Sequence, residues 1–154
     1  MLPTPKTIIA DTSCFIILTN IGELQLLQQV YGTVVTTPEI AAEFGLELPD
    51  WVTIEAVQDI LRQQLLELQV DKGEASALSL ALEKPNCRII LDDYRARRAA
   101  EALHLEYTGT LGVLVRAKLD GILNSVKPIL AKIRQTNFRI SDAIEQQLLK
   151  EAGE

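Results

Sequence analysis

Short apolar runs alternate with segments of helical periodicity along the chain. The runs at residues 7–10, 33–36, 87–91 and 105–108 are aliphatic or β-branched and predict buried strands. Residues 51–57 form a further extended segment, which we expect at an edge of the sheet. Strands that alternate with helices favour an α/β fold, in which helices cover both faces of a parallel sheet.

Between the strands, apolar residues recur every three or four positions and predict helices. Thr37 is expected to cap one of them, because threonine followed by proline is a favoured helix start. In another, over residues 59–69, we expect the aliphatic residues Ile60, Leu61, Leu65 and Leu68 to face inward. The predicted helices span residues 13–18, 23–31, 38–44, 59–69, 71–83, 94–103, 111–119, 125–135 and 141–152.

The composition is that of a globular protein, with 47% hydrophobic and 23% charged residues. A chain of 154 residues can bury a substantial core, so we expect one domain over residues 1–154, with C-terminal helices in 125–154. No apolar run approaches the roughly 18 residues of a membrane span. The first residues lack the apolar region of a signal peptide. We therefore expect a cytoplasmic protein with no membrane partner.

The net charge of −6 is unevenly distributed along the chain. Residues 1–93 carry a net charge of −9, whereas residues 94–139 carry +6. An acidic segment followed by a basic one suits a cation-filled acidic pocket beside a phosphate-binding rim. The same basic side chains also suit ordinary solvated helix faces, so charge alone does not decide between the two.

Asp11 directly follows the first apolar strand, in the stretch Ile-Ile-Ala-Asp-Thr-Ser. Open α/β sheets bind their ligands in the crevice beyond the carboxyl ends of the strands. Asp11 is therefore a candidate metal ligand. The alternative is that Asp11, Thr12 or Ser13 only caps the next helix, since all three residue types are favoured there.

Further acids repeat this placement. Asp92 and Asp93 follow another apolar strand, and Glu74 lies in the first turn of a helix, on its apolar side. Glu43 ends a helix, with Glu39 one turn earlier. Several carboxylates in one cleft repel one another unless a cation neutralises them. Mg²⁺ or Mn²⁺ is the expected cation, because hard divalent ions take oxygen ligands and support phosphodiester hydrolysis.

Other catalytic chemistries lack the residues that they need. The chain has one histidine, His104, and its two cysteines have neither metal-ligand spacing nor a disulfide pattern. No strand is followed by a glycine-rich phosphate loop, and no Gly-x-Ser-x-Gly motif occurs. A metal held by acids is the chemistry that remains.

In their order along the chain, these motifs resemble a PIN domain, the metal-dependent nuclease fold of VapC-type toxins. The resemblance covers nearly the whole chain. Its motifs are Ile-Ile-Ala-Asp11-Thr-Ser13, Pro38-Glu-Ile-Ala-Ala-Glu43-Phe44, Asp71-Lys-Gly-Glu74, Ile-Leu-Asp92-Asp93-Tyr-Arg-Ala-Arg97, Tyr107-Thr-Gly-Thr110-Leu-Gly112 and Asn137-Phe-Arg-Ile-Ser141.

The resemblance implies a set of site residues. Asp11, Glu43 and Glu74 match the first three acids of the family, with Glu39 as the alternative to Glu43. The fourth acid falls on Asp92 or Asp93, and Asp93 is preferred. The residues implied in orienting ligands or gripping the substrate are Ser13, Thr110, Arg95, Arg97 and Arg98.

The implied fold is a three-layer α/β/α sandwich around a parallel sheet of four or five strands. The implied activity is cleavage of single-stranded or loop RNA with Mg²⁺ or Mn²⁺, by the toxin of a type II toxin–antitoxin pair. Such a toxin is inhibited by a cognate antitoxin and commonly forms a homodimer. The alternative is a catalytically weak or inactive PIN-like module that binds RNA or protein.

Overall fold

The structure is a computed structural model that describes residue 5 and residues 7–154. The predicted domain boundary at residue 1 lies outside the described residues. Within them, one or two helices separate each strand from the next between β1 and β5, and three helices, α7 to α9, follow β5. None of the described helices has the length and apolar character needed to cross a membrane.

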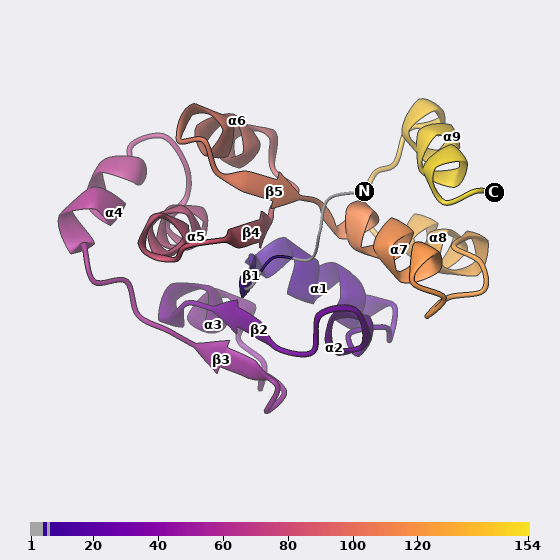
Figure 1. The fold of residues 1–154 in the computed structure, drawn as a ribbon, viewed down its shortest axis with the longest axis horizontal. Helices are drawn as coiled ribbons and strands as arrows, with labels where there is room; N and C mark the ends of the chain where they lie inside the picture. The colour runs from indigo at the N-terminus through magenta and orange to yellow at the C-terminus, as the bar shows by residue number, and fades with distance from the viewer. Residues whose placement is uncertain (1–4, 6) are drawn as a thin grey trace.

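The centre of the fold is a five-stranded, all-parallel sheet in the order β3-β2-β1-β4-β5 (Figure 1). In the central strand β1, Ile9 lies opposite Val35 of β2 and Ile89 of β4. The prediction of an α/β sandwich with a parallel sheet is confirmed, and the extended segment after Trp51 does form an edge strand. The strands are β1 (Thr7–Ala10), β2 (Val34–Thr36), β3 (Val52–Ile54), β4 (Cys87–Ile90) and β5 (Glu106–Thr108).

Helices cover both faces of this sheet. In the view of Figure 1, α4 and α5 lie to the left of the sheet, and α7, α8 and α9 lie to its right. The helices are α1 (Thr12–Asn20), α2 (Leu26–Tyr31), α3 (Pro38–Phe44), α4 (Ile60–Leu66), α5 (Lys72–Glu83), α6 (Tyr94–Ala102), α7 (Thr110–Leu119), α8 (Lys127–Arg134) and α9 (Asp142–Glu151).

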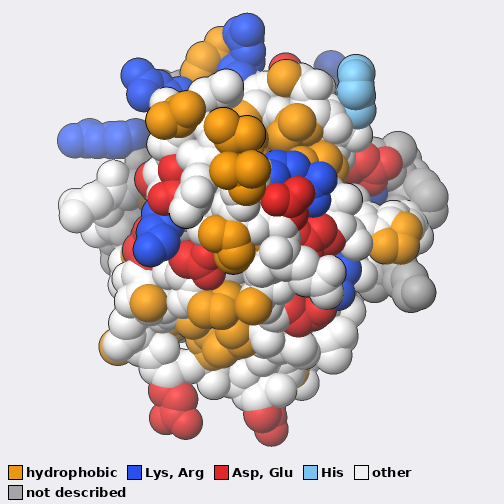
Figure 2. All heavy atoms as spheres, turned by 90° about the vertical axis from the view of Figure 1, so that its left-hand side faces the viewer, with side chains coloured by type: hydrophobic (Ala, Val, Ile, Leu, Met, Phe, Trp, Pro, Cys, Tyr) orange, Lys and Arg blue, Asp and Glu red, His pale blue; other side chains and the backbone are white. Residues whose placement is uncertain are grey.

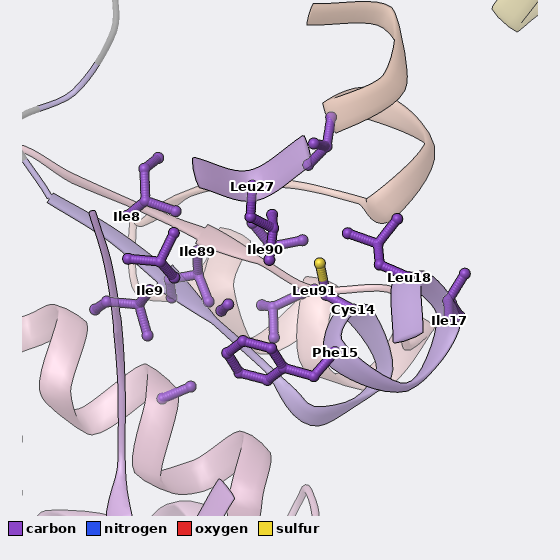
Figure 3. Packing of buried hydrophobic residues seen from close by; sticks show 14 of the residues in the cluster. Ile8, Ile9, Cys14, Phe15, Ile17, Leu18, Leu27, Ile89, Ile90 and Leu91 are labelled. Carbon is purple, nitrogen blue, oxygen red and sulfur yellow. The ribbon is translucent and has the colours of Figure 1, made fainter. Parts of the chain in front are cut away.

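The core forms where β1 and β4 meet the helices that follow β1. Ile9 and Ile89 are fully buried in the sheet, and Phe15 and Leu18 of α1 are fully buried against it (Figure 3). The ring of Phe15 also packs 5.6 Å from the ring of Phe44 at the end of α3. Each such side chain contributes about 1.5–3 kcal/mol by leaving water. This packing fixes the central strand, and with it the residue that follows the strand.

Helix α3 has the bounds and the cap that the sequence predicts. The Thr37 Oγ1 atom accepts a hydrogen bond of 3.2 Å from the backbone N–H of Ile40. Pro38 stands at the first helical position, where its missing N–H costs nothing. Gly45 ends the helix at a φ of 73°, a left-handed conformation that favours glycine.

The prediction of an inward aliphatic face on α4 is wrong. Ile60, Leu61, Leu65 and Leu68 are all exposed, with Leu61 at 68% and Leu68 at 82%. The residue that α4 buries is Gln63, whose side chain donates to Glu39 of α3. Exposed hydrophobic side chains are visible among charged ones on the side of the molecule where α4 lies (Figure 2). Within the described chain, the apolar stripe is therefore mostly exposed rather than part of the core.

Candidate active site

Asp11 stands at the carboxyl end of the central strand, where its neighbours hold the backbone. Its N–H donates to the carbonyl of Ile90 in β4 at 3.3 Å. On the other side, the buried Thr36 hydroxyl of β2 donates to the carbonyl of Ala10 at 3.0 Å. The Asp11 side chain is only 5% exposed. The sheet thus presents a buried carboxyl group at a fixed position.

Asp11 occupies the N-cap position of α1, but its side chain makes no capping hydrogen bond. The pKa of Asp11 is raised to about 7, first by burial and then by the nearby carboxylates of Glu74, Asp71 and Glu43, while the Thr12 backbone N–H lowers it. The Asp11 side chain therefore does not cap α1. Asp11 is a buried acid that faces three other acids.

Glu74 is brought to Asp11 by the first turn of α5. It is 8% exposed and shares a reciprocal pair of hydrogen bonds with Asp71. The Asp71 N–H donates to Glu74 Oε1 at 3.2 Å, and the Glu74 N–H donates to Asp71 Oδ1 at 2.8 Å. Burial, followed by the charges of Asp71 and Asp93, raises the pKa of Glu74 to about 7. The sequence reasoning did not single out Asp71, although an acid three residues before a glutamate is the signature of this capping box.

Helix α3 contributes Glu43. Its carboxylate lies against Gly73 in the first turn of α5, since a Cβ atom on Gly73 would stand 3.1 Å from Glu43 Oε2. Glu39, the alternative on the same helix, points elsewhere and accepts a 2.6 Å hydrogen bond from Gln63 Nε2. We refer to Asp11, Glu43, Asp71 and Glu74 as the acidic cluster.

The two helices that carry these glutamates are joined by a buried pair of hydroxyl groups. Thr37 Oγ1 and Ser76 Oγ are 2.7 Å apart, and both residues are fully buried. Ser76 also donates to the Gly73 carbonyl at 2.6 Å. The N-terminal cap of α3 is thereby fixed to the first turns of α5.

Asp92 and Asp93 differ in their surroundings. Both Asp92 oxygens are hydrogen-bonded: Oδ1 accepts from the Thr110 N–H at 2.8 Å, and Oδ2 accepts from Ser13 Oγ at 2.9 Å and Thr110 Oγ1 at 2.6 Å. Asp93 is exposed and caps α6 through one oxygen, which accepts from the Ala96 N–H at 3.1 Å. Its charge also acts on Glu74. Ser13 and Thr110 thus hold Asp92, whereas Asp93 caps α6 and is near enough to Glu74 for its charge to act there.

The three arginines of α6 have different roles. Arg97 is half-buried: its Nε donates to the Leu91 carbonyl at 2.8 Å, and its guanidinium lies 5.3 Å from the centre of the Tyr107 ring. Arg98 is exposed and lies over Tyr94 on its own helix. Arg95 is also exposed. Of the three, Arg97 lies beside Asp92, and both side chains are next to Gly109. A Cβ atom added to Gly109 would collide with the Arg97 guanidinium and stand 3.0 Å from Asp92 Oδ1.

The acidic cluster has the chemistry of a site for a hard divalent cation. Its donors are carboxylate oxygens, the ligands that Mg²⁺ and Mn²⁺ prefer. Burial and the charges of neighbouring acids raise the pKa values of Asp11 and Glu74, so their charged forms are disfavoured unless a cation is bound. Within residues 7–154, however, no three acidic, histidine or cysteine side chains close around one point as a finished coordination shell. The residue types fit a metal, which would have to draw them together.

Comparison with protein families gives one match. The model of a family described as PIN domain matches residues 7–154 of this chain. No curated protein and no solved structure matches the chain significantly. The match spans every strand of the sheet and all the residues of the acidic cluster.

Proposed function

Because this chain belongs to the PIN domain family, a nuclease-type fold, we propose that it is an endoribonuclease that depends on Mg²⁺ or Mn²⁺. The observation that carries the proposal is Asp11, a buried acid at the end of the central strand that faces Glu43, Asp71 and Glu74. Asp11 and Glu74 are buried near other acids, which raises their pKa values and costs stability. A bound cation removes this cost, so the arrangement is best explained by cation binding.

We assign the metal-holding role to Asp11, Glu43, Glu74 and Asp93. A bound divalent cation supplies the positive charge that neutralises a phosphate and makes a water molecule more acidic. Asp92 acts differently, because its two oxygens are already occupied by Ser13 and Thr110. It links β4, α1 and α7, and so holds Asp93 and Arg97 in place beside the acidic cluster.

The proposed substrate is single-stranded or loop RNA. Arg95, Arg97 and Arg98 lie on α6, the helix that Asp93 caps. Arginine binds phosphate oxygens through a planar, forked guanidinium. These residues are placed to hold the RNA backbone while the acids act on one phosphodiester.

The proposal includes two protein contacts, which follow from the resemblance to VapC-type toxins. One is a cognate antitoxin that inhibits the nuclease, and the other is a second copy of this chain. The exposed aliphatic face of α4 is an apolar surface available for such a contact.

The test is cleavage of a panel of single-stranded and hairpin RNAs by the purified chain, with Mn²⁺, Mg²⁺ or EDTA. We expect cleavage only with metal. Asp11→Asn, Glu43→Gln and Asp93→Asn should each lower the rate by about 100-fold or more, because each removes a charge worth several kcal/mol in the transition state.

Glu39→Gln is the matched control. It makes the same change on the same helix as Glu43→Gln, one turn away, at a residue bonded to Gln63. It should cleave RNA at nearly the rate of the unmodified protein. Cleavage that persists in EDTA, or in both Asp11→Asn and Asp93→Asn, would refute the assigned site.

A further inference from the structure

A pocket of about 700 Å³ opens beside Asp92, at the β5 edge of the sheet. Its walls come from β5, from the first turns of α7 and from α9, together with the loop that precedes α9. Its volume lies within the range of roughly 300–1,000 Å³ usual for small-molecule sites. A smaller pocket of about 210 Å³ lies next to it and shares Tyr107, Thr108 and Gly112 as lining residues.

Two arginines line the larger pocket. Arg97 is fixed by its bond to the Leu91 carbonyl and by the Tyr107 ring. Arg139 comes from the loop before α9. Among the residues that the structure describes, neither forms an ion pair, whereas Arg134 of α8 contacts Asp142 and Glu145. The pocket is also lined by two acids, Glu151 and Asp92, and the Asp92 oxygens are occupied by Ser13 and Thr110. The forked guanidinium groups of the two arginines are suited to an anion such as phosphate.

The rest of the lining suits a planar ring. Phe138 is half-buried at the pocket, and Leu111 and Ile144 provide further apolar surface. Gln147 adds an amide that can bond to the edge of a base. Unpaired bases are commonly bound by proteins through stacking on aromatic side chains.

We propose that this pocket binds one unpaired nucleotide of the RNA substrate, next to the phosphodiester that is cleaved. Arg97 and Arg139 hold its phosphate, and the base lies against Phe138. The inference rests on the proposed nuclease function, because Asp92, which lines the pocket, follows β4, and β4 pairs with β1, the strand that Asp11 follows. It adds a requirement that the substrate be single-stranded at this position.

The experiment measures binding of the four ribonucleoside 5′-monophosphates and of inorganic phosphate by calorimetry. It uses the full chain carrying Asp11→Asn, in EDTA, so that cleavage and metal binding do not contribute. We expect at least one nucleotide to bind, and to bind more tightly than phosphate. Arg97→Gln and Phe138→Ala should each weaken it by about tenfold, as the loss of one base-stacking or charged contact does.

Two further variants sharpen the test. Gly109→Ala adds a methyl group that displaces the flexible end of Arg97, at a φ of −110° that alanine adopts freely. Gly109→Ala should weaken nucleotide binding as much as Arg97→Gln does. Arg134→Gln removes an arginine that lies near α9 but outside the pocket, and should change the affinity by less than twofold. Circular dichroism confirms that each variant is folded.

The outcomes separate this inference from the proposed function. The pocket assignment is overturned if no nucleotide binds at millimolar concentration, or if Phe138→Ala binds like the parent, which would leave a phosphate site only. If nucleotides do not bind while the unmodified chain cleaves RNA with Mn²⁺, the nuclease proposal stands and the pocket proposal fails. If nucleotides bind as expected while no RNA is cleaved, the nuclease proposal fails, and with it the placement of the pocket beside a cleaved phosphodiester, although the pocket is a nucleotide site.

Discussion

The buried acids at the strand ends are unfavourable for the stability of the metal-free protein. Asp11 has an ordinary pKa near 3.8 in the unfolded chain, and in the folded chain burial and its acidic neighbours raise the pKa to about 7. The folded state therefore holds a proton that the unfolded state has lost at pH between these values. Stability must then fall as the pH rises through this range.

We predict that Asp11→Asn stabilises the metal-free protein at alkaline pH. In EDTA, the free energy of unfolding of the unmodified chain should decrease between about pH 4 and pH 7. The variant should lose the part of that decrease that comes from Asp11, keep the part that comes from Glu74, and be more stable at pH 8 by roughly 2–4 kcal/mol. Urea unfolding at pH 4, 6 and 8 measures the effect.

Asp50→Asn is the control, since Asp50 is an exposed acid in the segment before β3. It should follow the pH dependence of the unmodified chain. Equal stability of Asp11→Asn and the unmodified chain at both pH 4 and pH 8 would show that Asp11 is not a buried, protonated acid.

At the level of single residues, the sequence located the acids better than it distinguished them. The burial of Asp11 and Glu74 near the sheet could be predicted, because Asp11 directly follows a buried strand and Glu74 lies on the apolar side of its helix. Asp92 and Asp93 could not be told apart, because the difference lies in partners that are 18 and 79 residues away, Thr110 and Ser13. Arg139 was seen only as one charge in a basic segment, since its pocket forms when α9 folds against α7.

At the level of elements, the site depends on how α3 and α5 are joined. Each helix starts with its own cap, Thr37 in one and Asp71 in the other. The hydrogen bond between Thr37 and Ser76 connects the first turns of the two helices, and it thereby helps to position Glu43 on α3 and Glu74 on α5. A change in this bond should therefore affect catalysis without touching either glutamate.

We predict that Ser76→Ala lowers both stability and the rate of RNA cleavage. The buried Thr37 hydroxyl would lose its partner, which costs about 1–3 kcal/mol. The kcat of cleavage should fall while KM stays nearly constant, because the acids shift and the arginines do not. Denaturant unfolding and steady-state kinetics measure the two effects.

Ser79→Ala provides the comparison on the same helix. Ser79 is also fully buried, but its hydroxyl has no hydrogen-bond partner among the described residues. Removing it should leave stability and kcat unchanged or slightly improved. If the two variants behave alike, the bond to Thr37 has no positioning role.

The prediction of helices was correct where capping residues near both ends agreed with the periodicity. It was wrong where it depended on what the helix packs against. Helix α3 has a cap, a proline at its start and a glycine at its end, so its bounds were predicted to the residue. Helix α4 has an equally clear aliphatic stripe, but periodicity shows only that a stripe exists. It does not show whether the stripe meets the same chain, so Leu61 and Leu65 were placed inward although they are exposed.

At the scale of the whole molecule, the exposed stripe on α4 gives a direct prediction. Leu65→Gln and Leu68→Gln should change the free energy of unfolding of the isolated chain by no more than about 0.5 kcal/mol, because both side chains already face water. Leu78→Ala, in the fully buried part of α5, should cost roughly 2–5 kcal/mol. A loss above 1 kcal/mol in either surface variant, measured at low protein concentration, would contradict the exposure of α4.

The outermost strands of the sheet, β3 and β5, are only three residues long. A foreign peptide that extended the sheet at either edge would gain only a few main-chain hydrogen bonds, and short edges of this kind discourage such pairing. The molecule is therefore poorly suited to fibril growth or to capturing an extended peptide by strand addition. Specificity for any macromolecule it meets must reside in side chains, where single substitutions can change it.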